Sequence, residues 1–230
     1  MIALVRMRLA GFVRTGRALA PLLTVLVVLG VIYGGGRAQA GEAYGFSAAV
    51  LFPVLAWQTQ ILLNAEPDVQ RQLSIVAVGG RGRELAAGLL AALVPALAMV
   101  ALVLAVPWPI SGITGPEAPG DPSLASGVTA GVWAHLLLVP PALLLGALAS
   151  RAVVGNAARG LAVLAGGTVL AFVLGTKGSP VPWLVPPLLP TARATVNGLD
   201  APALAAQTAI ALTWTAAALA AYTALRRRNT

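Results

Sequence analysis

The sequence predicts an all-α polytopic membrane protein, in which a single domain of 230 residues crosses the membrane six times. Hydrophobic residues make up 58% of the chain and charged residues only 10%, and the mean hydropathy is +0.87. In soluble domains about a quarter of the residues are charged. The segments outside the predicted spans are too short to build a core of their own, so we expect one transmembrane domain over 1–230.

Six apolar stretches supply the transmembrane helices, and most approach the ~20 residues that a helix needs to cross a ~30 Å hydrocarbon core. They cover 18–34, 45–64, 86–106, 127–149, 160–175 and 203–225. The first stretch has an alternative as the apolar region of a signal peptide, because Ala38-Gln39-Ala40 has the small-x-small form of a cleavage site. The long basic region before it, and Arg37 beside the site, favour a retained helix.

The basic residues lie mainly on one side of these spans. Twelve of the fifteen belong to that side, namely Arg6, Arg8, Arg14, Arg17, Arg71, Arg81, Arg83, Arg151, Arg159, Arg226, Arg227 and Arg228. The other side holds Arg37, Lys177 and Arg193. The positive-inside rule therefore places both termini in the cytoplasm. The net charge of +8 favours anionic lipid headgroups of the bilayer as the partner, and no nucleic acid is expected. A composition rich in Ala, Gly, Leu, Val and Arg is typical of bacteria with GC-rich genomes, so we expect a bacterial plasma membrane.

Residues 1–17 have the pattern of an interfacial helix. By their spacing, one helical face carries the apolar side chains Ile2, Val5, Leu9 and Phe12. A neighbouring face holds the three arginines that we expect at the membrane interface, Arg6, Arg14 and Arg17. Arg8 lies on the opposite flank. The alternative is that these arginines act only as a topology signal.

Between the second and third spans, 66–78 predicts a short amphipathic helix on the cytoplasmic side. Pro67 suits the first helical position, and the acids Glu66 and Asp68 suit the positive end of the helix dipole. One face carries the apolar side chains Val69, Leu73 and Val76, at steps of four and three. The pair Gly79-Gly80 ends the helix.

The segment 180–198 is apolar but contains too many prolines for one continuous helix. We expect short re-entrant helices that dip into the outer leaflet before the last span, where protein or a water-filled cavity must satisfy the backbone. The residues that we assign to this segment are Pro182, Trp183, Pro186, Pro187, Pro190, Arg193 and Asn197.

The sequence shows no chemistry for ATP hydrolysis or metal binding. Gly175-Thr176-Lys177-Gly178-Ser179 lacks the Gly-Lys-Ser/Thr order of a phosphate-binding loop. With no cysteine and His135 as the only histidine, we expect no metal site. An intramembrane hydrolase centred on His135 is an alternative, although no Gly-x-Ser-Gly motif is present and no span contains an acid. A neutral, hydrogen-bonded packing residue fits this histidine better.

Two segments resemble sequences of a known family. Residues 66–81, which run from Glu66 through Gly79-Gly80 to Arg81, are similar to the coupling-helix region of ABC-2 type (type V) ABC transporter permeases. The run from Pro186 to Leu199 resembles the segment before the last span of that family. The order of interfacial helix, six spans, cytoplasmic helix and re-entrant helices also resembles its architecture.

The resemblance implies a non-catalytic permease subunit of an ABC exporter. Such a subunit pairs with a second permease chain, identical or homologous, and with two copies of a separate ABC ATPase subunit. ATP and Mg would bind to the ATPase, and this chain would bind no cofactor. Residues 66–78 would lie in a groove of the ATPase, with the apolar side chains filling the groove or anchoring the helix to the bundle. The implied coupling residues are Glu66, Asp68, Val69, Arg71, Gln72, Leu73 and Val76.

The resemblance further implies export of an amphipathic or hydrophobic substrate, such as a drug, an antibiotic, a peptide or a lipid-like molecule. The path would run between two permease chains, lined by the second and fifth spans of each, with an outer gate near 181–197. The alternative function is that of a membrane-embedded accessory or assembly protein without a transport path.

Overall fold

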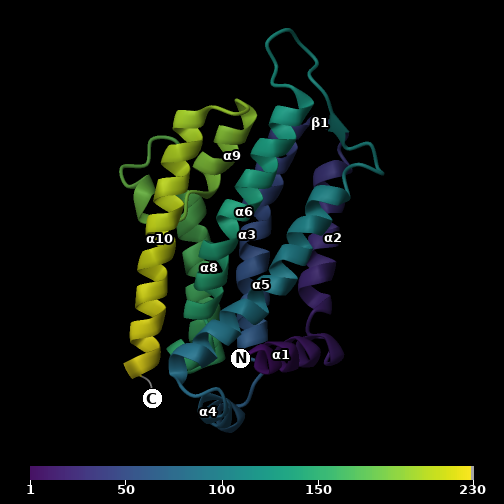
Figure 1. Cartoon of the computed structure of the whole chain (residues 1–230). Coiled ribbons are helices and arrows are strands. Elements are labelled where there is room, and N and C mark those ends of the chain that lie inside the picture. Colours follow the sequence, from purple (N-terminus) through teal and green to yellow (C-terminus); the bar gives the residue numbers. More distant parts are fainter. Residues whose placement is uncertain (229–230) are drawn as a thin grey trace.

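The computed structural model describes residues 1–228 as a bundle of helices with one short pair of strands (Figure 1). The helices are α1 (Ile2–Arg14), α2 (Leu19–Tyr33), α3 (Ala40–Leu63), α4 (Asp68–Ala77), α5 (Arg81–Ala105), α6 (Leu124–Leu148), α7 (Arg151–Val154), α8 (Ala157–Leu174), the 3-10 helix η1 (Pro182–Leu184), α9 (Leu188–Val196) and α10 (Ala201–Arg228). The strands are β1 (Ala38–Gln39) and β2 (Ile113–Thr114), which pair in parallel.

Five of the described helices are long and apolar enough to cross a membrane, namely α3, α5, α6, α8 and α10. The count reaches six only if α1 and α2, which meet at an angle of 67°, are taken together as one bent span. The chain therefore has the character of an all-α membrane protein. The predicted first span, 18–34, corresponds to α2, which has only 15 residues. The chain turns into α2 at Gly16, whose φ of 70° is a conformation that glycine adopts without steric cost.

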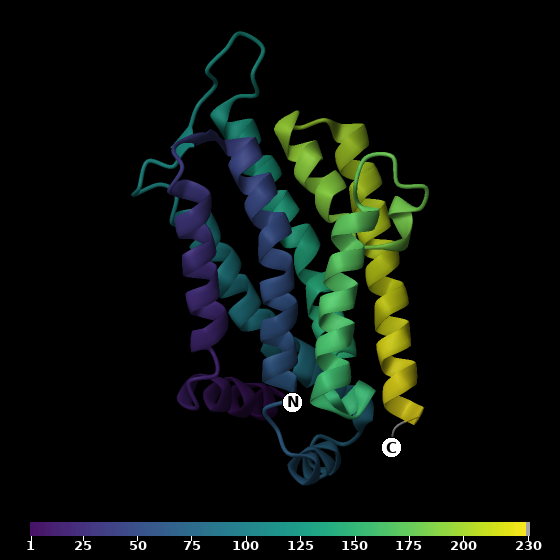
Figure 2. The ribbon, with the colours of Figure 1, turned by 180° about the vertical axis from the view of Figure 1, so that it is seen from behind.

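Helices α3 and α6 form the centre of the bundle, with α2 at one edge and α10 at the opposite edge (Figures 1 and 2). Glycines on α6 allow the close approach: a Cβ at Gly131 would collide with Tyr44, and one at Gly146 would collide with Ala56 and Thr59. Small residues at such contacts are how helices pack tightly where lipid offers no hydrophobic driving force. By contrast, only 17% of the apolar window of α8 and 11% of that of α10 is buried within the chain.

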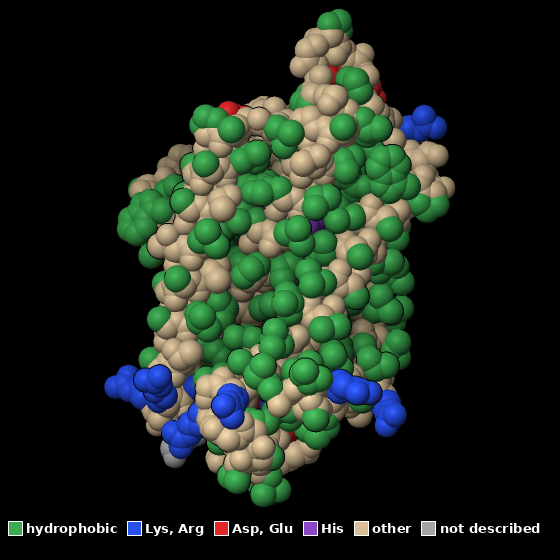
Figure 3. All heavy atoms as spheres, in the orientation of Figure 1, with side chains coloured by type: hydrophobic (Ala, Val, Ile, Leu, Met, Phe, Trp, Pro, Cys, Tyr) green, Lys and Arg blue, Asp and Glu red, His purple; other side chains and the backbone are tan. Residues whose placement is uncertain are grey.

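One end of the bundle, which we call the basal end, carries α1, α4 and the last turn of α10 (Figure 1). Figure 3 shows Lys and Arg side chains gathered there, next to a surface made mostly of hydrophobic side chains. The opposite, distal end carries the strands, the long loop before α6, and α9. This arrangement agrees with the alternation of arginines along the sequence.

The loop between α5 and α6 contains β2, which pairs with β1 at the distal end. Asp121 organises the rest of the loop: its Oδ2 accepts hydrogen bonds from the backbone N–H groups of Ala118 (2.8 Å) and Glu117 (3.0 Å) and from the side chain of Gln39 (2.7 Å). Backbone hydrogen bonds from Ala118 and then Glu117 stabilise the ionised carboxylate and lower the pKa of Asp121 below its ordinary value.

Candidate functional site at the basal end

Four charged side chains from distant parts of the chain meet inside the basal end. Arg8 of α1 donates from Nε (3.0 Å) and Nη2 (2.5 Å) to the Oε2 of Glu66, which lies between α3 and α4. Its Nη2 also lies 2.5 Å from the Oε1 of Glu84, in the first turn of α5. The Oε2 of Glu84 accepts from the Nη2 of Arg226, in the last turn of α10, at 2.7 Å. Ser74 of α4 donates to the Oε1 of Glu66 at 2.5 Å. We call these five residues the basal network.

The basal network is buried, with exposed fractions between 3% for Glu84 and 8% for Arg8. Burial of an ion is costly unless a partner of opposite charge and good geometry compensates. Here two arginines face two glutamates, so the formal charges balance. Glu84 at the start of α5 and Arg226 at the end of α10 also match the dipoles of their helices. The network thus joins α1, α4, α5 and α10.

Glu66 is buried in the structure, whereas the sequence predicted it on the surface of the amphipathic helix. We expected Glu66 among the residues that contact an ATPase, but its carboxylate is enclosed by Arg8 and Ser74. The reason is tertiary: α1 packs against the start of α5 and brings Arg8 to the turn that precedes α4. The amphipathic helix itself begins at Asp68 and ends at Ala77, slightly inside the predicted 66–78.

The outer face of α4 is apolar and open. Val69, Leu73 and Val76 are 74%, 66% and 80% exposed, so they do not anchor the helix to the bundle. The inward anchor is Ser74 instead. Of the polar coupling residues, Asp68 and Gln72 are exposed, whereas Arg71, which pairs with Asp68 at 2.6 Å, is half-buried.

The residues predicted for the outer gate lie at the other end of the bundle. Pro186 and Pro187 are buried, Pro182 and Pro190 are half-buried, and Trp183 and Asn197 are exposed. The segment forms the two short helices η1 and α9 rather than one continuous helix, as its prolines predict. Arg193 donates from Nη2 to the carbonyl oxygen of Gly175 at 2.9 Å and thereby ties α9 to the end of α8.

The predicted interface arginines Arg6, Arg14 and Arg17 are exposed, whereas Arg8 turns inward. The position of Arg8 on the opposite flank of α1 was the one sequence signal of this difference. Nothing local in the sequence marks Glu84, Ser74 or Arg226 as members of a site.

No protein-family model, curated protein or solved structure matches this chain.

His135 lies deep in the bundle, far from the basal network. Its Nδ1 is 2.8 Å from the carbonyl oxygen of Gly131 and its Nε2 is 3.3 Å from the Oγ of Ser47. A proton on Nδ1 satisfies the carbonyl and leaves Nε2 as an acceptor near the serine hydroxyl, whose one proton can also go to the carbonyl oxygen of Tyr44 at 3.2 Å. The sequence has no Gly-x-Ser-Gly motif to mark a serine for this histidine, and the fold brings Ser47 beside it. The pair is nearly fully enclosed, and the cavity beside Ser47 measures about 10 Å³, room for one water at most.

Among residues 1–228, no group of three or more His, Cys, Asp or Glu side chains is placed to hold a metal ion.

Proposed function

We propose that the chain is the permease subunit of an ATP-driven exporter, similar in plan to ABC-2 type permeases, with α4 as its contact to a separate ATPase. The observation that carries this proposal is the two-sided character of α4. Its outer face presents Val69, Leu73 and Val76 to the surroundings, and its inner face is fixed through Ser74 to the buried basal network.

The apolar face of α4 needs a partner if the basal end lies in the cytoplasm, as the gathering of arginines there supports. The helix projects beyond the ends of the long helices (Figure 1). Three large apolar side chains exposed together to water mark an interaction surface, and an amphipathic helix inserted in a groove is a common form of protein recognition. Because the chain has no phosphate-binding loop, the ATPase that we propose as the partner is a separate protein, present in two copies with ATP and Mg.

The basal network supports a lever mechanism. If ATP binding moves the ATPase, it pushes α4, and the buried ion pairs resist separation from α1, α5 and α10. Removal of one partner from a buried ion pair costs roughly 3–5 kcal/mol. A push on α4 would therefore shift these helices together rather than bend the connecting segments one by one.

The path for the substrate is best placed beside α8, between this chain and a second permease, identical or homologous. Of the two spans that the family plan puts along the path, α3 is 67% buried inside the chain and has little surface left, whereas α8 is largely open. An apolar groove of about 400 Å³ lies near the distal end, between η1 with Trp183 and Leu184 and the side of α10 with Trp214. Its size and lining suit a drug-sized, amphipathic or hydrophobic substrate.

Co-purification tests the proposed contact. The tagged chain is purified from the membranes of its own host, and the P-loop ATPase recovered with it is identified and measured. Leu73→Glu should lower the recovery at least tenfold, because a charge would have to be buried in the apolar contact. Gln70→Glu adds the same charge at an exposed position of the same helix, outside the apolar face and outside the predicted coupling residues, and should leave the recovery within about twofold. Equal recovery with both variants refutes the proposed contact.

Two other functions give different results. A membrane-embedded accessory or assembly protein would purify alone and stimulate no ATPase. An intramembrane hydrolase, for which the enclosed pair Ser47 and His135 is the supporting observation, would lose its activity in His135→Ala while α4 variants keep it.

A further inference from the structure

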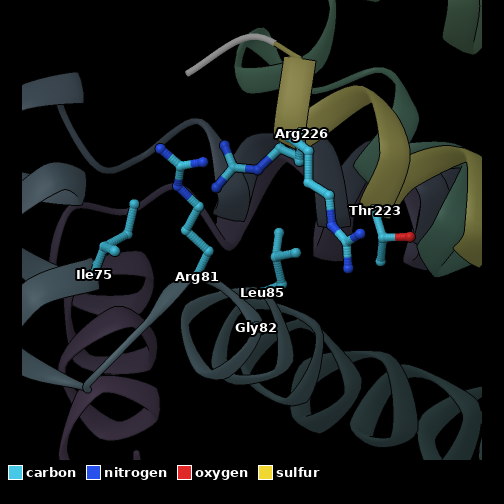
Figure 4. Close-up of a pocket in the computed structure, with 7 residues that line it drawn as sticks. Ile75, Arg81, Gly82, Leu85, Thr223 and Arg226 are labelled. Carbon is cyan, nitrogen blue, oxygen red and sulfur yellow. The ribbon is translucent and has the colours of Figure 1, made fainter.

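A cavity of about 340 Å³ opens at the basal end between α4, α5 and α10 (Figure 4). Three arginines line it, Arg81 from α5 and Arg226 and Arg227 from α10, and no acid does so among the described residues. Ile75 of α4 and Leu85 of α5 form an apolar part of the wall. The cavity therefore combines cationic and apolar surfaces.

The charge of the wall is set by the basal network behind it. Within the network, Arg8 and Arg226 are balanced by Glu66 and Glu84. Arg81 adds a further formal positive charge on the cavity side, and the side chain of Arg227 lines the same cavity. Glu84 holds Arg226 at 2.7 Å and keeps its guanidinium buried, so one of the three cations is fixed in place before any ligand arrives.

The start of α5 adds to the attraction for an anion. Arg81 is the first residue of this 25-residue helix, and its first turn borders the cavity with Gly82. The amino end of a helix carries a partial positive charge and directs N–H groups outward. Figure 4 shows Arg81 from α5 and Arg226 and Thr223 from α10 around the same space.

We propose that this cavity binds the phosphate group of an anionic membrane lipid. Guanidinium groups recognise phosphate oxygens through paired, charge-assisted hydrogen bonds. The cavity lies between the first turn of α5 and the last turns of α10, two helices long enough to cross the bilayer, which places it at the depth of the headgroups. Ile75 and Leu85 offer the glycerol and the first methylenes an apolar contact, which favours a lipid over a free phosphate ion. Basic pockets between membrane helices are a known form of headgroup site.

A lipid bound in this cavity would bridge the helix that we assign to ATPase coupling, α4, to α5 and α10. This site does not depend on the proposed transport function, because its ligand is recognised by the arginines and not by the ATPase or the substrate.

Binding of short-chain lipids to the purified full chain tests the proposal. The probes are dihexanoyl-phosphatidylglycerol, dihexanoyl-phosphatidylcholine and inorganic phosphate, each titrated in a neutral detergent. We expect the wild-type chain to bind phosphatidylglycerol at least tenfold more tightly than phosphatidylcholine. Arg81→Gln with Arg227→Gln should weaken phosphatidylglycerol binding about thirtyfold, the effect of two basic residues near an anionic headgroup.

The matched control removes two exposed arginines at the same end, Arg14→Gln in the last turn of α1 with Arg17→Gln in the turn between α1 and α2, and should change the affinity less than threefold. An equal loss in the control, or equal affinity for the two lipids in the wild type, overturns the proposal. If inorganic phosphate binds as tightly as phosphatidylglycerol and displaces it, the ligand is a free phosphate and the lipid assignment is wrong. The lipid preference of the wild type stands as a test even if the arginine variant folds poorly.

Discussion

Replacement of Glu84 by Gln should destabilise the bundle more than any single exposed charge change. The substitution keeps the shape of the side chain but removes the negative charge that faces Arg8 at 2.5 Å and Arg226 at 2.7 Å. The basal network would then keep two buried arginines but only one of its two carboxylates, Glu66, and both arginines would lose their ion pair with Glu84. Breaking a buried ion pair from one side costs roughly 3–5 kcal/mol. For a chain of this size that corresponds to a fall in Tm on the order of 10 °C.

Thermal unfolding of the purified chain in one detergent measures this loss. Glu117→Gln is the matched control, because it makes the same chemical change at an exposed acid of the distal loop. Surface changes of this kind stay within about 0.5 kcal/mol. A fall in Tm for Glu84→Gln no larger than for Glu117→Gln would refute the assignment of Glu84 to a buried network.

A double-mutant cycle identifies the partner. Arg226→Gln alone should also destabilise the chain, and the double variant should lose less than the sum of the two, by about 1 kcal/mol or more, since residues in direct contact are coupled. Additive losses, equal to the sum within about 0.5 kcal/mol, would show that Glu84 and Arg226 do not interact.

Three other predictions concern separate parts of the molecule. Gly146→Val should lower the free energy of unfolding by about 2 kcal/mol or more, because the new side chain meets the backbone of α3 at Ala56. In the same unfolding assay Gly166→Val should be tolerated, because a Cβ at Gly166 meets nothing within 4 Å. The distal loop should loosen in acid, because the pKa of Asp121 is lowered by the loop's hydrogen bonds. The stability that the ionised carboxylate adds to the loop is complete above its ordinary pKa of 3.8 and is lost as the pH falls through the lowered pKa. Protease cleavage of the loop should therefore increase in that pH range, and in Asp121→Asn it should not depend on pH. Asp68→Ala with Arg71→Ala should reduce ATPase co-purification, but less than Leu73→Glu does, because Asp68 and Arg71 are bonded to each other and an ion pair with an exposed carboxylate contributes little. Full loss from the double alanine variant would instead assign the contact to charge.

The helices and their order could be predicted from the sequence because each depends on a local pattern. The spacing of Val69, Leu73 and Val76 predicted an amphipathic helix, and α4 follows within two residues of the predicted bounds. The prolines of 180–198 predicted a broken segment, and η1 and α9 follow. The predicted first span was the weak case, because α2 is short and reaches the length of a span only with α1, across a bend of 67°.

The basal network could not be predicted, because its members lie far apart in the chain. Arg8 and Glu84 are separated by 76 positions, and Glu84 and Arg226 by 142. For the same reason Glu66 was assigned to a surface that it does not reach. Its neighbours Asp68 and Val69 are exposed, whereas Glu66 is buried because α1 and the start of α5 pack against it.

By itself, the sequence determined that this chain is helical, apolar and charged mainly on one side. Helix periodicity and the cost of placing charges in hydrocarbon act residue by residue, so they can be summed along a segment. Only the tertiary structure determined which of those charged side chains lie at the surface and which form buried ion pairs between helices. Burial of Arg8, Glu66, Glu84 and Arg226 is stable only as a set, and a set of mutual partners exists only once four distant segments have met.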